Sequence, residues 1–454
     1  MKNEKTNKKT NGKKTATVPT ADPRKTALVS LILCEENARY TNLELDATLK
    51  RTNFTDKDRA LYTVLLYGVT ERKISLDYQI YKLSSKDLSK FDRPVIMLLR
   101  MGLYQMLYMN SIPDHAAISS TVALAKKYVH EGSQGFINAI LREAQRKLKN
   151  ENGEYTLITP VKERDLCGYL SITYSVPRYL CKAWVKEFGE ERAESIMKAL
   201  DKPAPTVLRV NTMKTDRDSL ISELTDAGIK AIPSEKTNDG VILPEGGIVT
   251  NLNAMREGRC FVQDDASSLC VKMLDPKEGE TVYDLCACPG GKSFGIAIAM
   301  KNKGVIRSFD LHESKLSLIT SGAETLGLDI ITAKAADSSL PIPELFETAD
   351  RVLCDVPCSG FGTIAKKPDL RNKQVDTIRD LPSIQLKILE NGSKYVKRGG
   401  VLVYSTCTLM EAENQSNVTA FLTLHPEYKL ISSTTLLPDE GTDGFFFAKM
   451  VKQK

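Results

Sequence analysis

Long apolar runs are absent from this sequence. No stretch reaches the roughly 18 consecutive apolar residues that a membrane-spanning helix requires, so no membrane span is expected. The N-terminus is polar and rich in lysine, and it lacks the apolar core of a secretory signal. Both absences favour a cytoplasmic protein.

Histidine is scarce, and no two cysteines have the C-x-x-C spacing that many zinc sites use. The four histidines are scattered along the chain, so we expect no metal site. Ten cysteines in a chain without a secretory signal favour catalytic or buried thiols over disulfides.

The net charge of +6 comes from one end of the chain. Residues 1–25 hold eight basic and two acidic residues, and the rest of the chain has equal numbers of each sign. We expect residues 1–21 to form a disordered basic tail. If the folded part binds nucleic acid, it does so through local patches.

With 454 residues the chain is too long for one hydrophobic core, and three regions differ in pattern. Residues 22–150 have helical periodicity throughout, with Thr55 as a candidate N-cap and Asp58 three residues later. Residues 160–254 mix helices and strands in a small α+β module. Residues 255–454 alternate apolar strands with helices, which predicts a Rossmann-like α/β domain with a mostly parallel sheet.

A glycine-containing loop between a strand and a helix marks the candidate cofactor site in "TVYDLCACPGGKSFGIAIAM". It has neither the Walker pattern nor G-x-G-x-x-G, so a nucleotide without phosphates fits better than a dinucleotide. Asp310 ends the next strand and suits a ribose, and Asp337 follows the third strand, within reach of an adenine edge. The loop residues are Cys286, Ala287, Cys288, Pro289, Gly290, Gly291 and Lys292.

Two segments place a cysteine just beyond a strand end: "CDVPCSGFGTIAKKPDLR" with Cys358 and "VYSTCTLMEAEN" with Cys407. A thiolate that adds to carbon 6 of cytosine makes carbon 5 nucleophilic enough to attack a methyl-sulfonium, and a base must then remove the carbon 5 proton. Asp355 could bond the amidine edge of the pyrimidine. Taken singly, each cysteine would more often be a small buried hydrophobe.

Basic residues beside these segments are candidates for RNA phosphates. They are Lys366, Lys367, Arg371 and Arg209.

The motifs "CACPGGK", "CDVPCSGFGT" with "KKPDLR", and "YSTCTLMEAEN" resemble those of the Nop/Sun family of RNA cytosine-C5 methyltransferases. "LRVNTMK", "FVQDDASSL" and "DGFFFAKM" extend the resemblance over about residues 205–454. "DRALYTVLLYGVTERK" and "GFINAILRE" resemble the antitermination-factor-like, all-α RNA-binding domain of the bacterial members. This fusion points to the branch of the Sun or Fmu type that acts on small-subunit rRNA.

The resemblance implies that Cys407 is the nucleophile and that Cys358 assists product release, whereas DNA cytosine methyltransferases use the Pro-Cys thiol as nucleophile. The residues alone leave the two roles open. The resemblance further implies that Cys286 to Lys292, Asp310, Asp337 and Asp355 contact S-adenosylmethionine.

The expected substrate is 16S rRNA, and we expect a monomer. Two alternatives stay open: the same chemistry on tRNA or another RNA, and a non-catalytic RNA-binding assembly factor. The chain departs from the family pattern at Cys288, where alanine is usual, at the lysines 366–367 in place of a more Arg-rich run, and before Pro177, where a histidine is usual.

Overall fold

The structure is a computed structural model that describes residues 21–37, 39–246, 249 and 252–453. Residues 1–20 of the expected basic tail lie outside this range. The chain divides into two compact units, and the second begins at Thr159. Among the described residues, no helix is both long and apolar enough to cross a membrane.

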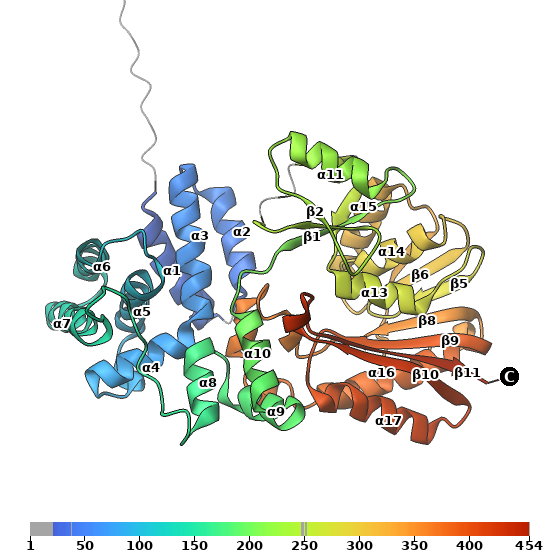
Figure 1. Ribbon diagram of the computed structural model, residues 1–454. Helices are drawn as coiled ribbons and strands as arrows, with labels where there is room; N and C mark the ends of the chain where they lie inside the picture. Colours follow the sequence, from blue (N-terminus) through green and yellow to red (C-terminus); the bar gives the residue numbers. More distant parts are fainter. Residues whose placement is uncertain (1–20, 38, 247–248, 250–251, 454) are drawn as a thin grey trace, which may run out of the picture. The chain divides into compact units, whose positions relative to one another are not determined.

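The N-terminal unit is all-α, as the periodicity of its sequence predicts (Figure 1). A short 3₁₀ turn precedes its fifth helix. The α-helices are α1 (Pro23–Glu36), α2 (Thr41–Arg51), α3 (Asp56–Glu71), α4 (Lys73–Ser84), α5 (Arg93–Tyr108), α6 (Asp114–Tyr128) and α7 (Glu131–Leu148).

Local signals explain where α3 begins and which side it buries. The Thr55 hydroxyl accepts a hydrogen bond from the Asp58 backbone N–H at 3.2 Å, which confirms the predicted N-cap. Tyr62, Leu65 and Leu66 recur at helical spacing and are fully buried in the core of this unit. Helical periodicity therefore translates directly into one buried stripe.

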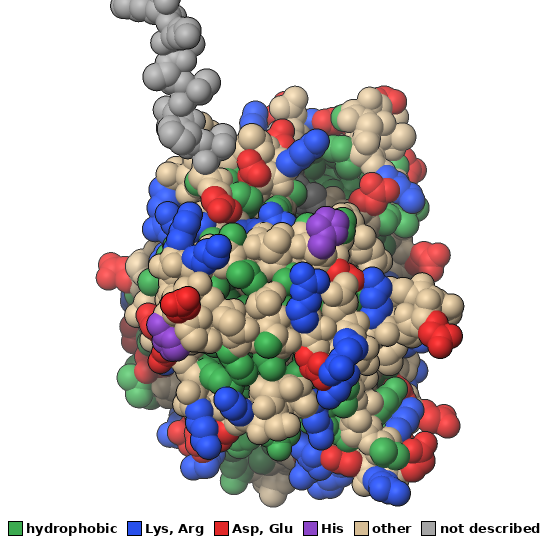
Figure 2. Space-filling view, turned by 90° about the vertical axis from the view of Figure 1, so that its left-hand side faces the viewer, with side chains coloured by type: hydrophobic (Ala, Val, Ile, Leu, Met, Phe, Trp, Pro, Cys, Tyr) green, Lys and Arg blue, Asp and Glu red, His purple; other side chains and the backbone are tan. Residues whose placement is uncertain are grey.

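One face of the N-terminal unit, which includes α6 and α7, is rich in basic side chains (Figure 2). Figure 2 shows the side of the molecule that carries α6 and α7, with Lys and Arg side chains spread across its centre and lower part. The exposed basic residues of α6 and α7 are Lys126, Lys127, Arg142, Arg146 and Lys147. Glu143 pairs with Arg146 and with Lys147, so part of this charge is neutralised locally.

The second unit begins with three helices and a small antiparallel sheet of order β2-β3-β1-β4. The helices pack on the segment around Phe361 and on Leu409, which lie within the two cysteine segments, after Cys358 and Cys407. The elements are α8 (Leu166–Tyr174), α9 (Arg178–Phe188), α10 (Glu190–Leu200), β1 (Thr206–Val210), α11 (Arg217–Asp226), β2 (Ile232–Pro233), β3 (Gly240–Leu243), α12 (Asn253–Arg256) and β4 (Cys260–Val262).

A seven-stranded sheet of order β10-β11-β9-β8-β5-β6-β7 forms the centre of the second unit. β5 to β9 are mutually parallel, whereas β11 runs antiparallel to β9 and β10 antiparallel to β11. The strands are β5 (Thr281–Asp284), β6 (Val305–Asp310), β7 (Ile331–Ala335), β8 (Ala349–Asp355), β9 (Val396–Thr406), β10 (Tyr428–Leu436) and β11 (Phe445–Lys452).

Helices cover both faces of this sheet (Figure 1). Successive strand residues such as Val403 and Tyr404 point to opposite faces and join separate apolar cores. One face carries α13 (Asp265–Leu274), α14 (Gly291–Ala299) and α15 (Leu316–Leu326), and the other carries α16 (Leu381–Tyr395) and α17 (Gln415–Leu424). The predicted α/β class with an all-α region and a small α+β module is confirmed.

Candidate active site

The two predicted cysteines meet at the carboxyl edge of the parallel sheet. β8 and β9 are neighbours, with Asp355 paired to Ser405, so the segments after them leave the sheet side by side. Cys358 and Cys407 follow these strand ends, and their Sγ atoms lie 3.3 Å apart. Two residues 49 positions apart in the chain thus form one thiol pair.

The surroundings of the two thiols favour different protonation states. The hydrogen bond to Cys407, together with burial, raises the pKa of Cys358, and the charge of Glu413 acts in the same direction. The same hydrogen bond lowers the pKa of Cys407 against the opposing effect of burial, and the charges of Lys367 and Lys292 assist. The shared hydrogen bond thus shifts the pKa values of the two thiols in opposite directions, upward for Cys358 and downward for Cys407.

An ion pair joins the cofactor loop to the strand that precedes Cys358. Lys292 Nζ lies 2.6 Å from Asp355 Oδ2, and Ser405 donates its hydroxyl to Asp355 Oδ1 at 2.8 Å. Burial alone would lower the pKa of Lys292, but the charge and hydrogen bond of Asp355, together with the charges of Cys270 and Cys407, raise it. The site therefore keeps a charged lysine and an oriented carboxylate beside the thiol pair.

The glycine-containing loop follows β5, as predicted, and turns into α14. Gly290 has φ of +108°, and a Cβ at this position would lie 2.5 Å from the Phe294 ring. Only glycine fits such a turn without strain. The backbone N–H of Cys288 donates to Asp310 Oδ2 at 3.3 Å, which ties the loop to the end of β6.

The three predicted acids lie at the same edge because β5 to β8 are parallel neighbours. Asp310 ends β6, Asp337 follows β7 and Asp355 ends β8. Asp310 also accepts the His312 N–H, and Asp337 accepts the N–H and hydroxyl of Ser339. Carboxylates beside a close-approach loop suit a nucleoside with hydroxyl donors and a cationic group, so the residues present fit such a cofactor.

Three family models match successive parts of the chain. The NusB family matches residues 21–146, the ferredoxin-like domain of RsmF/B-like methyltransferases matches residues 176–250, and the 16S rRNA methyltransferase RsmB/F model matches residues 271–451. The chain is also 40% identical over 451 residues to the probable ribosomal RNA small subunit methyltransferase B of Bacillus subtilis, covering 95% of this chain and 98% of the relative.

The chain belongs to the RsmB/F methyltransferase family. It is also 34% identical over 409 residues to ribosomal RNA small subunit methyltransferase B of Escherichia coli O17:K52:H18, covering 88% of this chain and 92% of the relative. Among solved structures, the crystal structure of PH0851 matches with a TM-score of 0.78 and 25% identity, over 96% of this chain and 99% of the other.

Two of the four basic residues that we expected to contact RNA are buried in this RsmB/F-family protein. Arg371 is 1% exposed and donates to the backbone carbonyls of Tyr174, Ser175 and Leu200. Arg209 is 6% exposed and bonds Asp239 and Gln263, each at 2.8 Å. These guanidinium groups hold the fold together and cannot reach a phosphate in this conformation, which corrects our expectation.

The other two basic residues lie at the surface. Lys366 pairs with both Asp264 and Asp443, which offsets its charge. Lys367 is exposed, and its charge helps to lower the pKa of Cys407. Of the four, Lys367 is therefore the one best placed to contact an RNA phosphate near the thiols.

Sequence reasoning missed three residues that hold the thiol loops. Glu413 and Asn414 lie within the segment "VYSTCTLMEAEN" but were assigned no role, and Gln385 on α16 carried no sequence signal. Glu413 and Asn414 are 3% and 5% exposed, and Gln385 is fully buried. For Glu413 and Asn414, the only available signal was that a polar residue in a segment expected to be buried needs hydrogen-bond partners.

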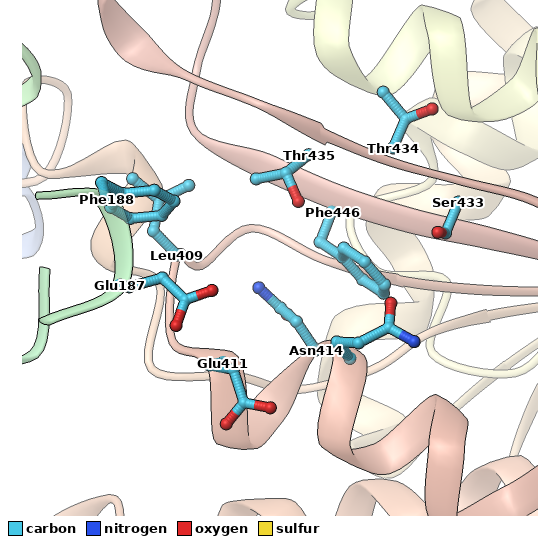
Figure 3. Close-up of a pocket in the computed structure, with 10 residues that line it drawn as sticks. Glu187, Phe188, Leu409, Glu411, Asn414, Ser433, Thr434, Thr435 and Phe446 are labelled. Carbon is cyan, nitrogen blue, oxygen red and sulfur yellow. The ribbon is translucent and has the colours of Figure 1, made fainter. Parts of the chain in front are cut away.

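A pocket of about 250 Å³ lies beside the loop that follows Cys407, lined by Leu409, Glu411 and Asn414 among others. Figure 3 shows Glu187 and Glu411 together at one side of it, away from Ser433 and Thr434 on β10. None of the two thiols, Lys292 or Asp355 lines this pocket. Within the part of the chain that is described, no group of His, Cys, Asp and Glu could hold a metal ion.

Proposed function

We propose that this protein transfers a methyl group from S-adenosylmethionine to carbon 5 of a cytosine in 16S rRNA, through a covalent bond between Cys407 and carbon 6. The observation that carries the proposal is the 3.3 Å thiol pair beside Lys292 and Asp355, at the sheet edge that also holds the glycine loop. The related proteins named as small subunit methyltransferases B support 16S rRNA as the substrate.

The cofactor, held by residues Cys286 to Lys292 with Asp310 and Asp337, supplies the methyl group as a sulfonium. Asp355 and Lys292 orient the target base, since a carboxylate and an ammonium can bond the donor and acceptor atoms of its polar edge. The base must leave its stack to reach the thiols, so a flipped or loop cytosine is the substrate.

The chain's own groups account for the proton movements. Cys407, as thiolate, adds to carbon 6, and its sulfur then carries no charge. Carbon 5, now nucleophilic, would bond the methyl group that the cofactor supplies and would still carry its proton. The hydrogen bond to the Cys407 thiolate is lost, which removes one cause of the raised pKa of Cys358, and Cys358 passes its proton to water. The Cys358 thiolate then takes the proton from carbon 5, and the electron pair of that bond expels Cys407. The thiol pair returns to its starting state.

RNA binding outside the site involves the N-terminal unit, whose match to the NusB family and exposed basic residues on α6 and α7 support this role. Lys367, beside the thiols, contacts a phosphate of the substrate. The thiols, the ion pair and the loop all come from one chain, which supports action as a monomer, in the cytoplasm where ribosomal RNA is available.

The test uses wild type, Cys358→Ala and Cys407→Ala, each incubated with labelled S-adenosylmethionine and unmodified 16S rRNA and then run on a denaturing gel. Cys358→Ala should accumulate a slow-migrating protein–RNA adduct, because the release step is blocked. Cys407→Ala should give neither adduct nor methylated RNA. Bisulfite sequencing of the wild-type product should place the new 5-methylcytosine.

Other outcomes contradict defined parts of the proposal. An adduct formed by Cys407→Ala but not by Cys358→Ala would exchange the roles of the two thiols. Methylation of tRNA in preference to 16S rRNA would overturn the substrate. A third outcome is that wild type binds RNA but shows neither binding of S-adenosylmethionine nor methyl transfer. In that case the protein is a binding factor and not an enzyme.

A further inference from the structure

The residues on either side of Cys358 are held by the buried carboxylate of Glu413 and by the side chain of Gln385, which bonds to it. Glu413 Oε2 accepts the Ser359 backbone N–H at 2.9 Å and the Gln385 side-chain amide at 2.8 Å. The same Gln385 amide donates to the Pro357 carbonyl at 2.9 Å. The backbone before and after Cys358 is therefore tied to Glu413, directly or through Gln385.

The residues on either side of Cys407 are held by the next residue in the chain. Asn414 accepts the Thr406 hydroxyl at 2.5 Å and donates its amide to the Thr408 carbonyl at 3.0 Å. The hydroxyls of Ser359 and Thr408 lie 2.7 Å apart and link the two loops directly. Glu413 therefore holds the backbone around Cys358, and the adjacent Asn414 holds the residues around Cys407.

Hydrogen bonding alone does not explain a carboxylate at position 413. A glutamine oxygen has two lone pairs and could accept the same two bonds. A carboxylate that is 3% exposed is costly to bury, and none of the ion pairs found among the described residues includes Glu413. Its negative charge acts on two groups beside this loop. One is the Cys358 thiol, and the other is the Lys373 ammonium, which donates to the Ser359 carbonyl at 2.9 Å.

We propose that Glu413 is a positioning residue that holds Cys358 beside Cys407 and, through its charge, keeps the proton of the thiol pair on Cys358. Cys407 is thereby left as the thiolate. Lys367 and Lys292 act on the opposite member of the pair and reinforce the asymmetry, whereas burial and the charge of Asp355 oppose it. The inference deepens the proposed function, on which its catalytic meaning rests.

Glu413→Gln separates the two contributions because it keeps the acceptor and removes the charge. The pH dependence of iodoacetamide labelling of each thiol, followed by peptide mass spectrometry without RNA, is the first readout. The labelling pKa of Cys358 should fall and that of Cys407 should rise, each by on the order of one unit. Methyl transfer to 16S rRNA near neutral pH should fall by roughly tenfold in kcat, and its pH profile should move to higher pH.

Glu413→Ala should add a loss of position to the loss of charge, so its kcat should fall further than that of Glu413→Gln. Glu411→Gln is the matched control, because this carboxylate is two residues away, exposed, and bonded to the Ser416 hydroxyl. Its thiol labelling and kcat should equal those of wild type. S-adenosylmethionine binding and thermal unfolding report whether each variant is folded.

Unchanged labelling of both thiols in folded Glu413→Gln would overturn the electrostatic role, whatever happens to kcat. If Glu413→Gln does not fold, Lys367→Met asks the same question from the other thiol, and an unchanged labelling pKa of Cys407 would count equally against the proposal. Since labelling needs no RNA, a failure of wild type to methylate 16S rRNA would contradict the proposed function while leaving this test readable.

Discussion

A single buried acid at the end of β5, at the sheet edge that carries the glycine loop, makes the stability of the fold depend on pH. Asp284 is 1% exposed and accepts the Ser293 hydroxyl at 2.7 Å. Burial, with a smaller contribution from the charge of Asp355, raises its pKa to about 7 despite that hydrogen bond. In the unfolded chain the same carboxyl titrates near its ordinary value of 3.8. The folded state therefore holds a proton that the unfolded state releases.

Wild type should lose stability as the pH rises because of Asp284, and Asp284→Asn should remove this loss. Between about pH 4 and pH 7 the folded protein binds the extra proton, so this group's contribution to the free energy of unfolding decreases as pH rises and is constant above pH 7. Relative to the variant, wild type should lose a few kcal/mol across this window, at about 1.4 kcal/mol per pKa unit. Urea denaturation at about pH 5 and pH 8 measures the difference.

The exposed Asp226, at the end of α11, provides the control. Asp226→Asn should follow the wild-type pH dependence, since the other titrating groups are shared. If Asp284→Asn also follows wild type, Asp284 is ionised in the folded protein at neutral pH and the expected raised pKa is wrong.

At the scale of helices, Arg371 acts as a shared C-terminal cap. Tyr174 ends α8, Ser175 is its C-cap and Leu200 ends α10, and their carbonyls all accept from the Arg371 guanidinium. Carbonyls at helix C-termini have no partner within the helix, and a cation there also complements the helix dipole. The Arg371 side chain therefore links the C-termini of α8 and α10 to the segment after Cys358.

Arg371→Met should destabilise the methyltransferase unit by about 2–4 kcal/mol, because buried carbonyls lose charge-assisted donors. Its affinity for 16S rRNA, measured below the unfolding transition, should be unchanged. Lys367→Met should do the opposite, with stability within about 0.5 kcal/mol of wild type and weaker RNA binding with a smaller salt dependence. A loss of RNA affinity in folded Arg371→Met would restore our original expectation for Arg371.

At the scale of the whole molecule, each compact unit has its own apolar core. The helical unit's core uses residues from Ala27 to Leu148, and the cores around the seven-stranded sheet use residues from Phe261 onward. Units with separate cores can fold separately. Chemistry and most of the RNA recognition are therefore expected to be separable along the chain.

Residues 159–454 expressed alone should fold and bind S-adenosylmethionine with an affinity within about twofold of the full chain. Their affinity for 16S rRNA should fall by at least about tenfold, with a shallower dependence on salt, because the basic residues of α6 and α7 are missing. Calorimetry and filter binding measure the two affinities. Full-length Lys126→Ala with Lys127→Ala should reproduce part of the loss, and full RNA affinity in the truncated protein would contradict this division.

The sequence by itself determined the fold class, the Thr55 cap, the glycine loop and the place of Cys358 and Cys407 just beyond strand ends. These features depend on local periodicity and on one rule of topology, namely that neighbouring parallel strands bring their carboxyl ends to the same edge. A short motif at a strand end is therefore enough to place a side chain in the site.

Only the tertiary structure decided which charged groups are buried. Arg371 and Lys367 lie four residues apart in one basic segment, yet the first is enclosed by α8 and α10 and the second is exposed. Glu413 likewise obtained its role from Ser359 and Gln385, which are distant in sequence. Burial and hydrogen-bond partners depend on how remote elements pack, and neither charge nor spacing along the chain records that packing.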